Sequence, residues 1–167
     1  MVTVMSNEFK DWYADLSEEQ KKNYKLCTEY PILIPRRRFW GTVCEEYQYE
    51  YTELDGMPKG WRAAFGEQWA KEIQGVINEL PEDIRDEIFI TDLKEKYGQL
   101  RQYFSHYTDA LDVVIRKYEA LSERTCICCG TPATKISWGW IAPYCNKCAK
   151  KMPYKIIDIN EWFEDGE

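Results

Sequence analysis

The stretch CICCGTPATKISWGWIAPYCNKC, residues 126–148, decides how the C-terminal part of this chain folds. It holds two Cys-x-x-Cys pairs with fifteen residues between them. Each pair can form a tight turn that points two thiolates at one ion, and the intervening segment is long enough for a hairpin that brings the pairs together. Gly130 suits the turn after the first pair. We therefore expect one metal site whose four ligands are Cys126, Cys129, Cys145 and Cys148.

This spacing is the pattern of a zinc ribbon. Four thiolates close a tetrahedral site around Zn²⁺ and leave no position for water, so the predicted cofactor is one structural zinc ion. Two alternatives use the same residues: iron in a rubredoxin-like site takes four cysteines, and a redox motif needs only one pair. Cys128 is expected to be a bystander, and Cys27 and Cys44 are expected to be small buried apolar residues.

Composition indicates a folded protein without disulfides. The 167 residues fit one compact domain with a small appended module, and 44% of them are apolar. Seven cysteines are an odd number, and the N-terminus lacks the charged and apolar regions of a signal peptide. The longest apolar run, Ile32 to Ile34, is too short to cross a bilayer. The sequence therefore predicts a soluble intracellular protein that does not bind membranes.

Upstream of the cysteines, one segment has two interpretations. Residues 88–104 fit either two strands around Gly98 or a helix with one apolar stripe. An interior glycine costs a helix about 1 kcal/mol, which favours the strands. The following segment is a clear helix from Thr108 or Asp109 to Ser122, whose predicted inward stripe is Leu111, Val114, Ile115, Tyr118 and Leu121.

The N-terminal half combines helical and extended patterns. Residues 6–26 are predicted to be helical, with Ser17 able to open a second turn. Pro31 and Pro35 bracket a short extended stretch. Tyrosines alternate with polar residues over 45–54, which is typical of a half-buried strand. An amphipathic helix is expected over 67–80, and a short helix after Pro81.

Together these segments predict an α+β fold in which helices pack with a small antiparallel sheet, plus the C-terminal four-cysteine ribbon. The predicted organisation has three parts. Residues 1–122 form an acidic α+β body, residues 123–155 form a zinc ribbon packed on it, and residues 156–167 form an acidic tail.

The net charge of −7 is spread unevenly. Five of the 22 basic residues lie between Cys126 and Lys155, a stretch without acids, so the other 17 stand against all 29 acids. The last twelve residues hold five acids and no base. An acidic body repels phosphate backbones and favours basic partners, although such charge also serves solubility alone.

The sequence holds no pattern that indicates an enzyme. It lacks a P-loop, a dinucleotide-binding glycine motif and the hydrolase and metalloprotease motifs. His106 is the only histidine, and a lone histidine at a loop edge needs a partner before it can act as a base. We therefore predict no catalytic residue and no site for an organic cofactor.

The ribbon segment interleaves lysines with aromatic residues, which is the composition of a surface that stacks bases and contacts phosphates. In the alternative interpretation, the aromatic rings pack the ribbon onto the body and the lysines offset the four thiolates. The residues concerned are Lys135, Lys147, Lys150, Lys151 and Lys155 with Trp138, Trp140, Tyr144 and Tyr154.

Several blocks of the sequence resemble a family of small phage and prophage proteins, most of them uncharacterised. These blocks lie at 30–36, 51–66, 93–101 and 117–122, followed by the cysteine motif, and together they cover roughly residues 26–150, most of the chain. The N-terminal helix and the acidic tail depart from the family pattern. The chain is also similar to acidic, zinc-containing phage inhibitors of the RNA-guided nuclease of type II CRISPR systems.

This resemblance implies an anti-CRISPR-like inhibitor in the cytoplasm of an infected bacterial host. Such nucleases hold nucleic acid in positively charged channels, where an acidic protein can compete with the target DNA. The expected partner is then a host protein, the type II nuclease. The alternative is a nucleic-acid-binding zinc-ribbon protein of phage DNA metabolism or transcription. Acids gathered on one face would favour the inhibitor, and lysines exposed beside Trp138 or Trp140 would favour nucleic acid.

Overall fold

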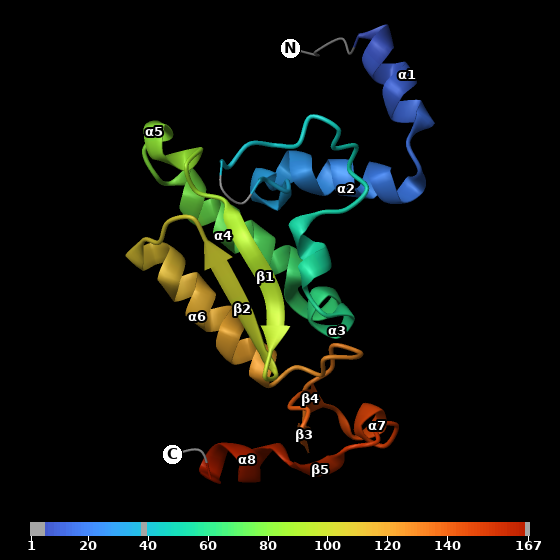
Figure 1. The fold of residues 1–167 in the computed structure, drawn as a ribbon, viewed down its shortest axis with the longest axis vertical. Helices are drawn as coiled ribbons and strands as arrows, with labels where there is room; N and C mark the ends of the chain where they lie inside the picture. Colours follow the sequence, from blue (N-terminus) through green and yellow to red (C-terminus); the bar gives the residue numbers. More distant parts are fainter. Residues whose placement is uncertain (1–5, 38–39, 166–167) are drawn as a thin grey trace.

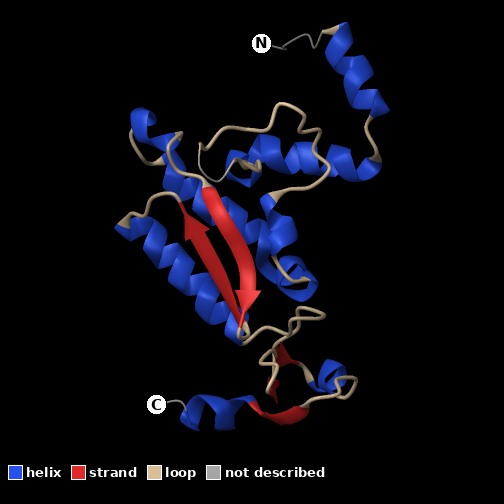
Figure 2. Ribbon diagram, in the orientation of Figure 1, coloured by secondary structure: helices blue, strands red, loops and turns tan. Residues whose placement is uncertain are grey.

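The computed structural model describes residues 6–37 and 40–165 (Figure 1). It is an α+β protein in which helices pack against one face of a two-stranded hairpin and a smaller module follows at the C-terminal end (Figure 2). The first five residues, which enter the signal-peptide argument, and the last two of the predicted acidic tail lie outside the described ranges. Among the described residues, no helix is both long enough and apolar enough to cross a membrane.

The hairpin at the centre of the body confirms the strand interpretation of residues 88–104. Strands β1 (Ile90–Lys96) and β2 (Gln99–Phe104) pair antiparallel, and Lys96 lies opposite Gln99. The loop is therefore only Tyr97 and Gly98, with φ of 55° and 77°. Two consecutive positive φ angles are typical of the type I′ turn, whose twist matches that of the strands.

One face of the hairpin packs on helices α4 (Glu67–Asn78) and α6 (Asp109–Glu123), which lie behind it in Figure 1. Both helices were predicted, and the buried stripe of each contributes to the core of the body. One stripe residue was wrong, since Leu121 is 43% exposed while its neighbour Ser122 is fully buried. The Ser122 hydroxyl accepts a hydrogen bond from the Leu100 amide at 2.9 Å, which joins the end of α6 to β2.

A buried polar chain crosses the same core. The indole N–H of Trp69 donates to Gln102 Oε1 at 2.7 Å, and the Gln102 amide donates to the Ile115 carbonyl at 2.9 Å. Buried polar groups need such partners because an unpaired one costs about 1–3 kcal/mol. The two bonds therefore fix α4, β2 and α6 against one another.

The predicted N-terminal helix is two helices. Helix α1 (Asn7–Asp15) ends before Leu16, and α2 (Glu18–Glu29) begins after Ser17. The Ser17 hydroxyl accepts from the Gln20 amide, while the Gln20 side chain accepts from the Ser17 amide. This capping box satisfies backbone donors that an unbroken helix would pair internally, so it explains where the second helix starts.

Two stretches predicted to be extended take other forms. Residues 45–54 form no strand, and Tyr49 has a φ of 61°. Their backbone carbonyls bond side chains of α2 rather than a sheet partner: Asn23 donates to the Tyr49 carbonyl and Gln20 to the Gln48 carbonyl. The proline-bracketed stretch contains a 3₁₀ turn, Pro31–Leu33, since proline at its first position presets a helical φ.

Short helical segments connect these parts of the body. The 3₁₀ turn Glu53–Gly56 lies against β1 and leads into α3 (Lys59–Trp61). A π-helical turn, Arg62–Gly66, then joins α3 to α4. The short helix predicted after Pro81 is α5 (Glu82–Arg85), and Ile88 is buried just beyond it.

The C-terminal module is a three-stranded antiparallel sheet in the order β4–β3–β5. Strand β3 (Lys135–Trp138) pairs with β4 (Pro143–Tyr144) on one side and with β5 (Lys155–Asp158) on the other. Helix α7 (Asn146–Ala149) lies between β4 and β5 in the chain, and α8 (Ile159–Asp165) follows β5. Residues 156–158, which belong to the segment predicted as a tail, therefore form part of this sheet.

The module is attached to the body through a close backbone contact. The Gly60 amide donates to the Ile127 carbonyl at 2.9 Å, and the indole of fully buried Trp61 donates to the Thr125 carbonyl at 2.9 Å. A Cβ added at Gly60 would lie 2.6 Å from the Ile127 oxygen and would also overlap the Cys126 carbonyl. Only glycine allows this approach.

We therefore expect Gly60→Ala to lower the free energy of unfolding by about 2–3 kcal/mol, because backbone atoms must move apart to make room. Gly75→Ala is the matched control, since a Cβ at this α4 position meets nothing within 4 Å. That change should stabilise the protein by about 0.5–1 kcal/mol. Urea unfolding monitored by tryptophan fluorescence measures both, and equal effects from the two changes would contradict the proposed contact.

Candidate metal centre

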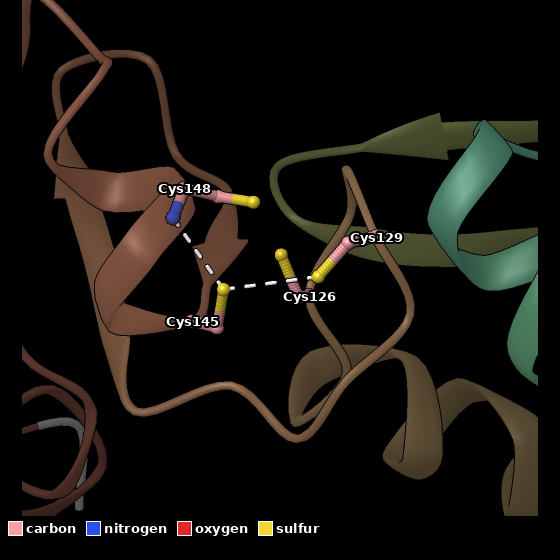
Figure 3. A group of neighbouring side chains, drawn as sticks. All are labelled: Cys126, Cys129, Cys145 and Cys148. Atoms are coloured by element: carbon pink, nitrogen blue, oxygen red, sulfur yellow. Dashed lines mark hydrogen bonds between the residues drawn. The ribbon is translucent and has the colours of Figure 1, made fainter.

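The four predicted cysteines lie together at the start of the C-terminal module. Their sulfur atoms are all within 4.8 Å of one another, and the side chains point toward a common centre (Figure 3). Cys126 is buried, Cys145 and Cys148 are half-buried, and Cys129 is exposed. The structure thus brings all four together, as the spacing predicted, in a group that could hold one metal ion.

The first pair is shaped by a turn directly after α6. The Cys126 amide donates to the Thr131 carbonyl at 2.7 Å, and the Gly130 amide donates back to the Cys126 carbonyl at 3.0 Å. Gly130 has a φ of 83°, and a Cβ there would lie 2.6 Å from the Gly60 carbonyl. Glycine is needed here both for the turn and for its contact with the body.

The second pair is shaped by the start of α7. Cys145 is the N-cap of this helix, and its sulfur accepts a hydrogen bond from the Cys148 amide at 3.4 Å. The Cys145 carbonyl accepts from the Ala149 amide at 2.9 Å. A helical turn places residues three apart on one side, so both sulfurs face the first pair.

The sulfur spacing fits a tetrahedral ion. Zn–S bonds of about 2.3 Å imply sulfur atoms about 3.8 Å apart in a regular tetrahedron. The sulfurs of Cys129 and Cys145 are 3.7 Å apart. All seven cysteines are free thiols rather than disulfides. The group therefore has the donor set and the size of a four-thiolate metal site.

Local hydrogen bonds prepare part of the site for a cation. The Cys148 amide lowers the pKa of the Cys145 thiol to about 6, because it donates to the sulfur and stabilises the thiolate. Thr131 lowers the pKa of Cys129 in the same way. Burial raises the pKa of Cys148, and the neighbouring cysteine sulfurs raise it further, because another negative charge beside them is unfavourable. A dication at the centre would remove that penalty.

The remaining cysteines lie outside this group. Cys128 is half-buried, and burial raises the pKa of its thiol. Cys27 is buried as predicted, and burial raises its pKa to about 11. Cys44 is only half-buried, which differs from the prediction, and it lies in an irregular segment just before residues 45–54.

The aromatic residues of the module fall into two groups. Tyr144 is buried beside the cysteines, as the packing interpretation requires. Trp138 and Trp140 are 58% and 65% exposed, and the Trp138 ring also contacts Trp162 of α8, with the ring centres 5.6 Å apart. Lys155 lies directly opposite Trp138 in the sheet, while Lys135 pairs with Asp158 at 3.6 Å.

Two residues outside the cysteine group, His106 and Tyr97, also bear on the sequence predictions. His106 is exposed in the loop between β2 and α6 and does not belong to the cysteine group. Tyr97, for which the sequence predicted no role, is exposed at the hairpin turn and lines a pocket together with Trp140. The sequence feature that could have identified Tyr97 is its position directly before the turn glycine, where asparagine or aspartate is usual and a large aromatic residue is not.

Comparison of the chain with protein-family models, with curated proteins and with solved structures finds no match. The resemblance to phage proteins therefore stays a hypothesis, and the function must be argued from the molecule itself.

We expect the purified protein to carry one metal ion per chain, and Cys126→Ser or Cys148→Ser to remove it and to lower the melting temperature sharply. A structural ion held by four thiolates couples roughly 10–16 kcal/mol of binding free energy to folding. Elemental analysis and thermal unfolding measure the two effects.

Cys128→Ser is the matched control, because it changes a neighbouring thiol outside the group. It should keep the metal and shift the melting temperature far less. Protein purified without chelators that holds neither zinc nor iron would contradict the metal site.

Proposed function

We propose that this chain is a nucleic-acid-binding protein that holds single strands on the exposed aromatic surface of its C-terminal module, with zinc as a structural ion. The observation that supports it most directly is the exposure of Trp138 and Trp140 in a segment, residues 126–155, that contains five lysines and no acid.

Exposed tryptophans beside lysines suit a single strand. Each base presents a flat face that stacks on an aromatic ring, worth about 1–3 kcal/mol per base, while lysines attract the phosphates. Lys155 lies opposite Trp138, and Lys147, Lys150 and Lys151 are exposed on and after α7. The position of exposed Lys155 beside Trp138 supports the nucleic-acid proposal.

The metal has a structural role in this proposal. Four thiolates occupy all positions of a tetrahedral ion, so none is left for substrate or water. The ion would connect the turn after α6 to α7, and between these two turns lies the β3–β4 segment that carries both tryptophans. Zinc is the ion we propose, because it favours four thiolates and has no redox chemistry of its own.

We expect the protein to bind an oligothymidylate with an affinity that falls steeply as salt rises, since phosphate contacts release counterions. Trp140→Ala should weaken binding by roughly 10-fold, because the ring can no longer stack on a base. Changing Lys147, Lys150 and Lys151 together to glutamate should weaken it further. Fluorescence anisotropy of a labelled strand across a salt series measures both effects.

Trp40→Ala is the matched control, because Trp40 is also an exposed tryptophan, at 73%, but lies away from the module. The next residue, Gly41, lies against Phe89, which precedes β1 at the end of the strand opposite to the module. Trp40→Ala should leave binding unchanged. The proposal is wrong if neither DNA nor RNA is retained at low ionic strength.

A second candidate function rests on the opposite charge. Helices α1 and α2 together with residues 44–51 carry nine acids and four lysines. The loop is fixed to the helices because Trp12 donates to the Gln48 side chain and Gln20 to the Gln48 carbonyl. Acids from both segments thus belong to one packed unit, here called the acidic unit. Such a surface suits an anti-CRISPR-like inhibitor that enters the basic DNA channel of a type II RNA-guided nuclease.

If the acidic unit competes for that channel, the protein should block target-DNA loading onto the nuclease–guide complex, and salt should weaken the block. Reversing Glu45, Glu46 and Glu50 together should reduce inhibition more than any single change, because such charges mainly tune the rate of encounter. A cleavage assay with purified nuclease, guide and target, together with a binding assay, measures this. Full cleavage and no complex at micromolar protein, across nucleases of several hosts, would exclude it.

A further inference from the structure

A cavity of about 280 Å³ lies where the hairpin turn of the body meets the β3–β4 turn of the C-terminal module. Its walls come from two segments more than forty residues apart, and the lining residues are Glu95, Lys96, Tyr97, Gly139, Trp140 and Ile141. Pockets for whole small-molecule ligands span about 300–1,000 Å³, so this one suits a single planar group.

Tyr97 is an unusual residue for its position. Its φ of 55° places it in the left-handed region, where a bulky side chain is strained and a type I′ turn favours asparagine. Its side chain is also 69% exposed, so burial in the core does not offset the strain. Backbone strain that is not offset by packing indicates that the aromatic ring of Tyr97 is needed for function.

The opposite wall is held in place by the contact between the two turns. A Cβ added at Gly98 would lie 3.3 Å from the Ile141 carbonyl, so the hairpin turn presses on the β3–β4 turn. The buried Ser137 hydroxyl donates to the Trp140 carbonyl and accepts from the Ala142 amide at 3.0 Å, which fixes that turn. At Gly139 a Cβ would meet nothing within 4 Å, so the cavity is open there.

Positive charge leads from this cavity along the open face of the hairpin. Lys96 lines the cavity, with its ammonium 5.5 Å from the centre of the Tyr97 ring. Lys94 and Arg101 are paired across the strands and lie on the face opposite the core residue Leu100. Within the described residues, Arg101 Nε is buried without a hydrogen-bond partner. The Arg101 guanidinium therefore has one N–H that no protein group in the described part of the chain accepts.

Two acids of β1 beside this path are already engaged. Glu95 accepts a hydrogen bond from the Gly98 amide at 2.9 Å, and Asp92 pairs with Lys94 at 2.9 Å. Tyr103, beside them, is exposed and has the Lys94 ammonium 5.7 Å from its ring centre. The face therefore combines cations with an exposed aromatic ring, as a track for a single strand does.

We infer that the cavity between Tyr97 and Trp140 holds one unstacked base of a single-stranded nucleic acid, whose backbone continues along Lys94 and Arg101 on the open face of the hairpin. This inference rests on the proposed function and adds to it that the binding site crosses from the C-terminal module onto the body.

The experiment uses an oligothymidylate of about 12 nucleotides with one central 2-aminopurine, whose fluorescence falls when it stacks on an aromatic ring. The full-length protein should quench it. Tyr97→Asn should abolish the quenching and bind roughly 10-fold more weakly, yet melt at the same or a higher temperature, because asparagine suits the turn. Tyr97→Phe, which keeps the ring, should behave as the unchanged protein.

A second arm tests the backbone track. Lys94→Gln combined with Arg101→Gln should flatten the slope of log affinity against log salt by about 0.7 for each phosphate that the protein no longer neutralises. An oligouridylate of the same length distinguishes RNA from DNA, and a duplex of the same sequence tests the requirement for a single strand.

The outcomes separate the inference from the proposed function. If no strand binds at low ionic strength, both fail. If the single strand binds but Tyr97→Asn leaves affinity and quenching unchanged, the base pocket is wrong while single-strand binding stands. If only the duplex binds, both fail.

Discussion

The contact of Gly60 with the backbone of Cys126 and Ile127 is the constraint on which the rest of this structure depends. It places the first cysteine pair against the body, and fully buried Trp61 fixes the preceding residue, Thr125, by a hydrogen bond. With that end held, the β3–β4 turn meets the hairpin turn at Gly98. The cysteine group, the exposed tryptophans and the cavity beside Tyr97 are therefore positioned by one backbone approach that no residue larger than glycine permits.

Sequence reasoning succeeded where the determining signal is local. The cysteine spacing is sufficient to bring four sulfurs together, and the glycine at position 98 distinguished a hairpin from a helix. It failed for residues 45–54, where alternating tyrosines suggested a strand. There the carbonyls are bonded by Asn23 and Gln20 of a helix more than twenty residues away, a long-range partnership that periodicity does not encode. The contact between the two turns is equally non-local, so the cavity could not be predicted.

Charge is separated along the molecule, which bears on both candidate functions. The acidic unit belongs to α1, α2 and the loop packed on them, whereas the lysines of the C-terminal module lie beyond the hairpin (Figure 1). The net charge of −7 for the whole chain therefore represents neither the acidic unit nor the lysine-containing segment of the C-terminal module. Within the module the five lysines of residues 126–155 are followed by the acids of β5 and α8, so a polyanion would be attracted by residues 126–155 and not by the module as a whole, since charges farther apart than about 8–10 Å are screened from each other at moderate salt.

The placement of β5 at the edge of the C-terminal sheet has a consequence for how the chain matures on the ribosome. Strand β3 gains its second neighbour from residues 155–158, whereas both cysteine pairs precede them in the chain. During synthesis, four thiolates can thus gather around an ion while one edge of β3 still lacks a partner. An unpaired edge invites pairing with other chains. Closure around an ion would hold the short strand in a compact loop until β5 pairs with it.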